Sequence, residues 1–142
     1  MRFMMLMYPS DAAEAGVMPD AKLVGEMMKY NEALTKAGVL LALDGLHPTS
    51  KGARVYFGGG KPKVADGPFT EAKEIVGGYW MIQVRSRDEA IEWARRCPAG
   101  DAKFIELRQV FEMADFPADV QEAAAAAEPA ITAALEARRN SA

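Results

Sequence analysis

The sequence predicts an α+β fold in which helices cover one face of an antiparallel sheet. Two apolar runs, residues 2–8 and 79–84, have large side chains at both alternating sets of positions, which is typical of central strands. Each run precedes a stretch with apolar residues at helical spacing, residues 21–37 and 87–97. A chain of 142 residues is long enough to form one domain with a sizeable core.

The first half of the chain predicts a strand, a helix and a second strand. Residues 9–19 are expected to form a loop, and Asp20 can cap the helix that follows. Apolar residues in this helix repeat at helical spacing: Leu23, Met27, Tyr30 and Leu34. Gly38 ends the helix in the C′ position, where a left-handed backbone is favoured. The short apolar run Val39–Leu43 then predicts the second strand.

A hairpin and a turn connect the two halves of the chain. Residues 53–57 and 62–65 flank Gly58-Gly59-Gly60, which we expect at the tip of the hairpin. Thr70 follows, and its hydroxyl can cap a helical turn that contains Lys73 and Glu74.

The second half of the chain repeats the pattern of the first. After the strand at residues 79–84, Ser86 and Glu89 form a capping box that predicts the start of a helix. Pro98 ends this helix, because proline removes a backbone donor. Residues 104–111 predict the last strand.

The order of these elements is β-α-β, hairpin, β-α-β, which is the split βαβ or ferredoxin-like pattern. Both helices then lie on one face of a four-stranded antiparallel sheet, and the other face is open. Because the central strands have large apolar groups on both sides, we expect a second copy to cover the open face in a homodimer. Residues 117–142 are rich in alanine and predict a helical arm interrupted at Glu128-Pro129.

Composition and charge exclude several classes of protein. A net charge of −3 and a pI near 5.2 provide no positive field for nucleic acid, so direct binding of DNA or RNA is not expected. Cys97 is the one cysteine, which excludes an internal disulfide and a multi-cysteine zinc site; no metal is expected. The glycines at 58–60 lack the following lysine and hydroxyl residue of a phosphate-binding loop, so no nucleotide cofactor is expected.

The N-terminal apolar run is too short for a signal peptide, and no run approaches the ~18 apolar residues of a membrane helix. We therefore expect no membrane association and a cytoplasmic location.

The segment Val64–Glu74 combines turn-forming residues with three carboxylates and a lysine. Gly67 can adopt positive φ, while Pro68 fixes its own φ near −65° and restricts the residue before it. The segment therefore predicts a rigid corner in the backbone.

This segment and the residues after it resemble the DGPF-motif, YCII-related proteins. The matching residues are Asp66-Gly67-Pro68-Phe69, Glu71, Lys73-Glu74, Gly77-Gly78-Tyr79, Ala90, Trp93-Ala94 and Cys97-Pro98. The resemblance covers residues 1–116, taken as the domain, and implies a dimeric α+β barrel. It implies no particular reaction, because most members have no established activity. YCII proteins proper are associated with a His–Asp pair, which cannot be carried over because the first helix here has no histidine.

Asp66 and His47 are the predicted catalytic residues. Asp66 lies at the rigid corner beside a lysine and a glutamate, so it can accept a proton or bind a polar ligand. His47 titrates near neutrality without help and is the predicted proton donor. The alternative for Asp66 is a structural turn in which its carboxylate accepts backbone N–H bonds. The alternative for His47 is a solvent-exposed or structural loop residue.

Arg54, Lys73, Glu74 and Trp80 are the predicted ligand-binding residues. Arg54 and Lys73 can neutralise an anionic ligand, or the charged residues around the corner can pair with one another and fix the loop.

Two further patterns concern the strands. Tyr79 and Trp80 alternate, so one faces the helices and the other faces the cleft between copies, with core packing as the alternative for both. Arg108 can bind an anion, although Glu106 on the same face favours an ion pair.

Two functions from different classes fit these features. The first is a small-molecule-binding protein or minor enzyme with a cleft beside Asp66-Gly67-Pro68-Phe69 and a small polar or anionic ligand. The second is a non-catalytic regulatory partner of an extracytoplasmic-function sigma factor. This association is implied by the resemblance alone, since similar proteins are often encoded beside such factors. The sequence leaves open whether the protein is an enzyme.

Overall fold

The computed structural model describes residues 1–140 as two compact units, residues 1–110 and the residues from Phe111 onward. The first unit contains β1 (Arg2–Tyr8), α1 (Asp11–Glu14), α2 (Ala21–Lys36), β2 (Leu40–Gly45), η1 (Thr49–Lys51), β3 (Ala53–Tyr56), β4 (Lys63–Asp66), η2 (Ala72–Glu74), β5 (Gly78–Gln83), α3 (Arg87–Arg95) and β6 (Phe104–Gln109). The second unit contains η3 (Met113–Asp115) and α4 (Ala118–Asn140).

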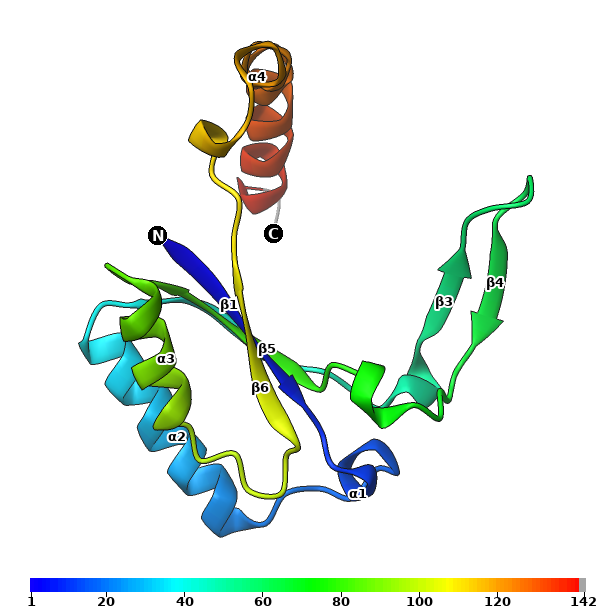
Figure 1. The fold of residues 1–142 in the computed structure, drawn as a ribbon, viewed down its shortest axis with the longest axis vertical. Coiled ribbons are helices and arrows are strands. Elements are labelled where there is room, and N and C mark those ends of the chain that lie inside the picture. The colour runs from blue at the N-terminus through cyan, green and yellow to red at the C-terminus, as the bar shows by residue number, and fades with distance from the viewer. Residues whose placement is uncertain (141–142) are drawn as a thin grey trace. The chain divides into compact units, whose positions relative to one another are not determined.

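The first unit is built on a four-stranded antiparallel sheet with strand order β2-β5-β1-β6. The two β-α-β units, β1-α2-β2 and β5-α3-β6, interleave in this order, and both helices lie on the same side of the sheet (Figure 1). Strands β3 and β4 form a separate two-stranded sheet. The predicted α+β class with an antiparallel sheet is confirmed.

The helices begin where side chains satisfy their free backbone N–H groups. Asp20 Oδ1 accepts a hydrogen bond of 2.8 Å from the Leu23 N–H at the start of α2, and Gly38 follows the helix with φ of 72°. Ser86 Oγ accepts a bond of 3.1 Å from the Glu89 N–H at the start of α3. Both predicted N-cap residues are therefore confirmed, whereas the capping box at Ser86 is only partly formed, because Glu89 Oε2 accepts its 2.8 Å bond from the Arg85 N–H.

The core lies between the sheet and helices α2 and α3. Its buried residues are Phe3, Met5, Tyr30, Leu34, Val39, Trp80, Ile82, Val84, Ala90 and Trp93. The Tyr30 hydroxyl donates a 2.7 Å hydrogen bond to the Trp93 carbonyl, and the Trp80 indole N–H donates a 2.9 Å bond to Asn31 Oδ1. The polar atoms of these large aromatic side chains are thus satisfied inside the core.

Three local expectations need correction. The region predicted as a loop at residues 9–19 contains α1, because Ser10 Oγ accepts a 3.1 Å bond from the Ala13 N–H and caps it. Strand β2 extends to Gly45, since Asp44 pairs with Tyr79 of β5. Helix α4 continues through Pro129 without the predicted interruption, in a sequence rich in alanine, the best helix former. None of the helices in the described part of the chain is both long and apolar enough to cross a membrane.

Replacing Leu34 by alanine tests the core. Leu34 is fully buried in α2, so Leu34→Ala should lower the free energy of unfolding by about 2–5 kcal/mol, through lost burial and the cavity left behind. Leu41→Ala is the matched control: Leu41 is 48% exposed, and the change should stay within about 1 kcal/mol. Urea denaturation measures both, and equal losses would contradict this description of the core.

Candidate functional site

We call Asp66-Gly67-Pro68-Phe69 the central motif. Thr49 joins this motif to two other segments of the first unit. Glu14 Oε1 of α1 accepts hydrogen bonds from both the Thr49 N–H, at 3.0 Å, and the Thr49 hydroxyl. Thr49 Oγ1 in turn accepts a 2.9 Å bond from the Phe69 N–H. At the base of the hairpin, the Gly67 N–H donates a 3.0 Å bond to the Gly52 carbonyl. The motif therefore fixes the position of the hairpin against α1 and η1.

Gly67 is required by close approach of the backbone. A Cβ atom built on Gly67 would lie 1.8 Å from the Thr49 carbonyl oxygen, which is far inside van der Waals contact. Gly67 is not among the glycines with positive φ, so the reason expected from the sequence was wrong. The Gly67-Pro68 peptide bond is cis.

The hairpin separates two of the predicted site residues. The Arg54 guanidinium lies 4.0 Å from the centroid of the Phe69 ring, a cation–π contact that attaches β3 to the motif. In the β3–β4 register Arg54 is opposite Ala65, whereas Asp66 is opposite Ala53. Because side chains alternate along a strand, Arg54 and Asp66 point to opposite faces of the hairpin.

The other predicted site residues do not bond to one another. The side chains of His47, Asp66, Lys73 and Glu74 are exposed. Within residues 1–140, no hydrogen bond or ion pair connects these four side chains. Their predicted catalytic and binding roles remain predictions.

Trp80 lies on the helix side of the sheet and is only 6% exposed. Its ring meets Tyr30 edge to face with centroids 6.0 Å apart. Trp80 is thus the member of the Tyr79–Trp80 pair that faces the helices, as the core-packing alternative expected, and its ligand-binding role remains a prediction.

The open face of the sheet holds a group of polar and aromatic side chains that sequence reasoning did not assemble. Cross-strand pairing places one row of residues across the four strands, in the order Asp44, Tyr79, Leu6 and Glu106. The neighbouring row is Ala42, Met81, Met4 and Arg108. The face therefore has an apolar centre and polar groups on its two outer strands.

Hydrogen bonds link the tyrosines of this face to carboxylates. The Tyr79 hydroxyl donates a 2.9 Å bond to Asp44 Oδ2 on the β2 side. On the β6 side, the Tyr8 hydroxyl donates a 3.2 Å bond to Glu106 Oε2. We call these the two tyrosine–carboxylate pairs.

The environment of each pair raises the pKa of its tyrosine. Burial, followed by the hydrogen bond to Glu106, raises the pKa of Tyr8 above its usual value. The hydrogen bond to Asp44 raises the pKa of Tyr79. Both phenols are therefore protonated donors at neutral pH.

Glu106 also forms an ion pair with Arg108, with Nη1 and Oε1 3.2 Å apart, as the sequence predicted. Phe104 stacks on Tyr8 with ring centroids 4.3 Å apart. The signal that could have found this group was the alternation along the strands, which places Leu6, Tyr8 and Tyr79 on the face away from the helices.

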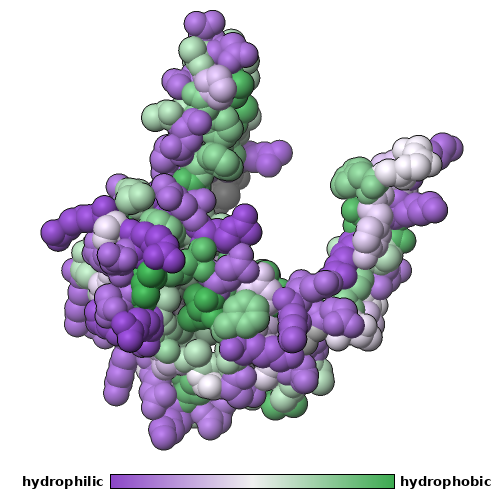
Figure 2. Space-filling view, viewed as in Figure 1, coloured by the Kyte–Doolittle hydropathy of each residue, from purple (hydrophilic) through white to green (hydrophobic). Residues whose placement is uncertain are grey.

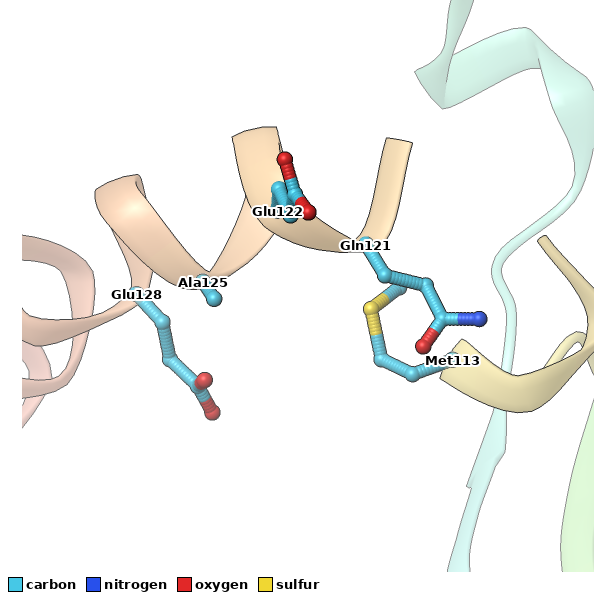
Figure 3. A pocket seen from close by; sticks show the side chains of 5 residues that line it. All are labelled: Met113, Gln121, Glu122, Ala125 and Glu128. Carbon is cyan, nitrogen blue, oxygen red and sulfur yellow. The ribbon is translucent and has the colours of Figure 1, made fainter. Parts of the chain in front are cut away.

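The described residues also line two surface hollows away from the open face. A hollow of about 270 Å³ beside the motif is lined by Asp11, Glu14, Ala15, Pro68 and Thr70. In the second unit, a hollow of about 350 Å³ is lined by Met113, Gln121, Glu122, Ala125 and Glu128 (Figure 3).

Two further kinds of site concern metal ions and the Cys97 thiol. In the described part of the chain, no cluster of three or more His, Cys, Asp or Glu residues is arranged to hold a metal ion. Burial raises the pKa of the Cys97 thiol to about 12, which disfavours the reactive thiolate.

The family model of the YCII-related domain matches residues 1–114. The chain belongs to the YCII-related family. The resemblance found in the motif string is thereby confirmed, and the match includes the whole sheet of this YCII-related protein as well as its hairpin.

Two known proteins are similar to this YCII-related chain. An uncharacterised protein of Rhizobium meliloti (strain 1021) is 33% identical over 76 residues, which cover 54% of this chain and 61% of the relative's length. The solved structure of 5-chloro-2-hydroxyhydroquinone dehydrochlorinase (TftG) from Burkholderia phenoliruptrix AC1100, in complex with 2,5-dihydroxybenzoquinone, is 14% identical with a TM-score of 0.46. The match covers 79% of this chain and 95% of that chain.

Replacing Gly67 by alanine tests the close approach to Thr49. The new methyl group would overlap the Thr49 carbonyl, so the corner must shift, and Gly67→Ala should lower the free energy of unfolding by about 1–3 kcal/mol. Gly25→Ala in α2 is the control, because nothing lies within 4 Å of its Cβ position. This helical change should stabilise by about 0.5–1 kcal/mol. Unfolding in urea measures both, and a neutral Gly67→Ala would contradict the close approach.

Proposed function

We propose that this YCII-related protein binds a small polar molecule on the open face of its sheet. The cavity forms when two copies of the ferredoxin-like unit face each other as a dimeric α+β barrel. The observation that supports the proposal is the open face itself, in which an apolar centre lies between the two tyrosine–carboxylate pairs. Small-molecule sites commonly combine an apolar lining with a few placed polar groups.

A second copy is the simplest cover for this face. Met4, Leu6 and Met81 form its centre, and they are only half-buried in the single chain. A large apolar patch that water contacts is unfavourable, and a two-fold symmetric pair covers the same patch on both copies. Polar groups at the outer strands would then line the ends of the enclosed space.

The chemistry of the face favours a ligand with hydrogen-bond donors. Asp44 and Glu106 accept bonds from the two tyrosines and have further lone pairs free for a ligand. Arg108, whose side chain is 70% exposed, can receive an anionic group of the ligand. Three strand spacings separate β2 from β6, about 14 Å, which is the width available to a small molecule.

The same pairs provide groups for proton transfer. Asp44 is a carboxylate within hydrogen-bond distance of a protonated phenol, so a bound molecule can lose a proton to the carboxylate and gain one from Tyr79. Under this proposal the central motif supports the site, and Asp66 and His47 are not required for it. The association with a sigma factor stays a prediction from resemblance.

Introducing a charge at Met81 tests the dimer. Met81 lies in the centre of the open face, so Met81→Glu should place a carboxylate in the interface and weaken dimerisation at least tenfold, about 1.4 kcal/mol. Met28→Glu is the matched control, because Met28 is 62% exposed on α2. Sedimentation equilibrium measures both. A wild-type monomer at micromolar concentration, or equal effects of the two changes, would contradict the facing sheets.

Ligand-dependent thermal shifts test the site. Wild-type protein is melted with a library of small hydroxylated, amino and carboxylic compounds, and a compound that binds the native state raises the melting temperature. Tyr79→Phe removes one donor of the face and should weaken binding of that compound about tenfold.

Asp66→Asn is the contrasting variant, since Asp66 lies at the base of the hairpin and forms no hydrogen bond with the two tyrosine–carboxylate pairs, and Asn preserves the turn. It should leave ligand affinity within about twofold of wild type. Loss of binding in Asp66→Asn with retention in Tyr79→Phe would instead place the site at the central motif.

A further inference from the structure

We propose that the hairpin of one copy lies over the open sheet face of the second copy and closes the ligand cavity. The inference rests on the facing dimer of the proposed function. We call residues 53–66, with strands β3 and β4, the hairpin arm. Figure 1 shows the arm as a separate element beside the four-stranded sheet.

The arm packs against little of the described first unit beyond its own base. Its strands pair only with each other, and isolated two-stranded hairpins are marginally stable in water. Its contacts with the rest of the unit are at its base, where Arg54 packs on Phe69 and the neighbouring Phe69 N–H binds Thr49. Beyond the base, the arm is exposed to solvent along its length (Figure 2).

One face of the arm is apolar and uncovered. The β3–β4 register places Val55 opposite Val64, on the face away from Arg54. Val55 is 48% exposed and Val64 is 68% exposed, while Phe57 just beyond β3 is 82% exposed. Apolar groups collected in this way mark a contact surface.

The length of the arm matches the face that it would cover. From Ala53 to Gly58 an extended chain reaches about 17 Å, and the four strands of the sheet span about 14 Å. The arm leaves the sheet after β2 and returns before β5. It is therefore long enough to span one end of the cavity between two facing sheets.

Charge complementarity selects a second copy as the occupant. Three cations and one carboxylate give the arm, residues 53–66, a charge of +2, in a chain whose net charge is −3. Lys61 and Lys63 lie in the outer part of the arm, and Lys63 is opposite Tyr56 on the face that bears Arg54. Asp44 and Glu106 lie on the outer strands of the open face, at the margins of its apolar centre. A basic arm on an acidic body favours association between copies over repulsion.

Crosslinking between labelled and unlabelled copies tests this arrangement directly. The two forms of full-length protein are mixed, exchanged and treated with a carbodiimide that joins lysine to carboxylate groups. We expect crosslinks from Lys61 or Lys63 to Asp44 or Glu106 that combine one labelled and one unlabelled peptide. Crosslinks confined to peptides of the same label, or none from these lysines, would overturn the proposal.

Substitutions in the arm provide the second test. Phe57→Ser and the pair Lys61→Glu/Lys63→Glu should each weaken dimerisation at least tenfold in sedimentation equilibrium, without a change in the melting temperature of the monomer. Met18→Ser, at a position 81% exposed, and Lys22→Glu/Lys29→Glu on α2 are matched controls that should leave the dimer intact. Unchanged dimerisation in both arm variants would overturn the proposal.

The two tests separate this inference from the proposed function. Crosslinks from arm to face with no ligand in the library would support the arm and count against the ligand site. If a ligand binds equally well to wild type and to both arm variants, the result would support the ligand site and would contradict a role of the arm in closing it.

Discussion

Alternation along β1 and β5 places large side chains on both faces of a sheet that α2 and α3 of the first unit cover on one side. Phe3, Met5, Trp80 and Ile82 point into the core beneath α2 and α3. The intervening residues point the other way and meet no element of the described first unit. This two-sidedness of the central strands determines where the core forms and which surface is left for a partner or a ligand.

The central motif positions the base of the hairpin, a role that its residue types alone do not indicate. Thr49, Glu14 and Phe69 form a short chain of hydrogen bonds, and the absence of a side chain at Gly67 lets the backbone pass against Thr49. The motif thus holds the hairpin base beside the end of the sheet that bears Asp44 and Tyr79. A structural motif and a polar sheet face can in this way belong to one site without sharing reactive groups.

Local features of the sequence predicted the fold well, and contacts between distant segments limited the prediction of the site. Spacing from Leu23 to Leu34 and the caps Asp20 and Ser86 depend only on near neighbours, so they were found from the sequence. The bond between Tyr79 and Asp44 joins residues 35 positions apart and depends on strand register, which the predicted end of β2 at Leu43 concealed. Gly67 was recognised as a special position, but its neighbour Thr49 could not be known before the chain was folded.

The hairpin is closed at its base by the bond from the Gly67 N–H to the Gly52 carbonyl, and this closure makes it a self-contained insert. The glycines at its tip meet nothing within 4 Å of their Cβ positions, so loop length there is decoupled from the register of β2 against β5. Relatives can lengthen, shorten or recompose the insert without disturbing the sheet, and selectivity can diversify on an unchanged scaffold.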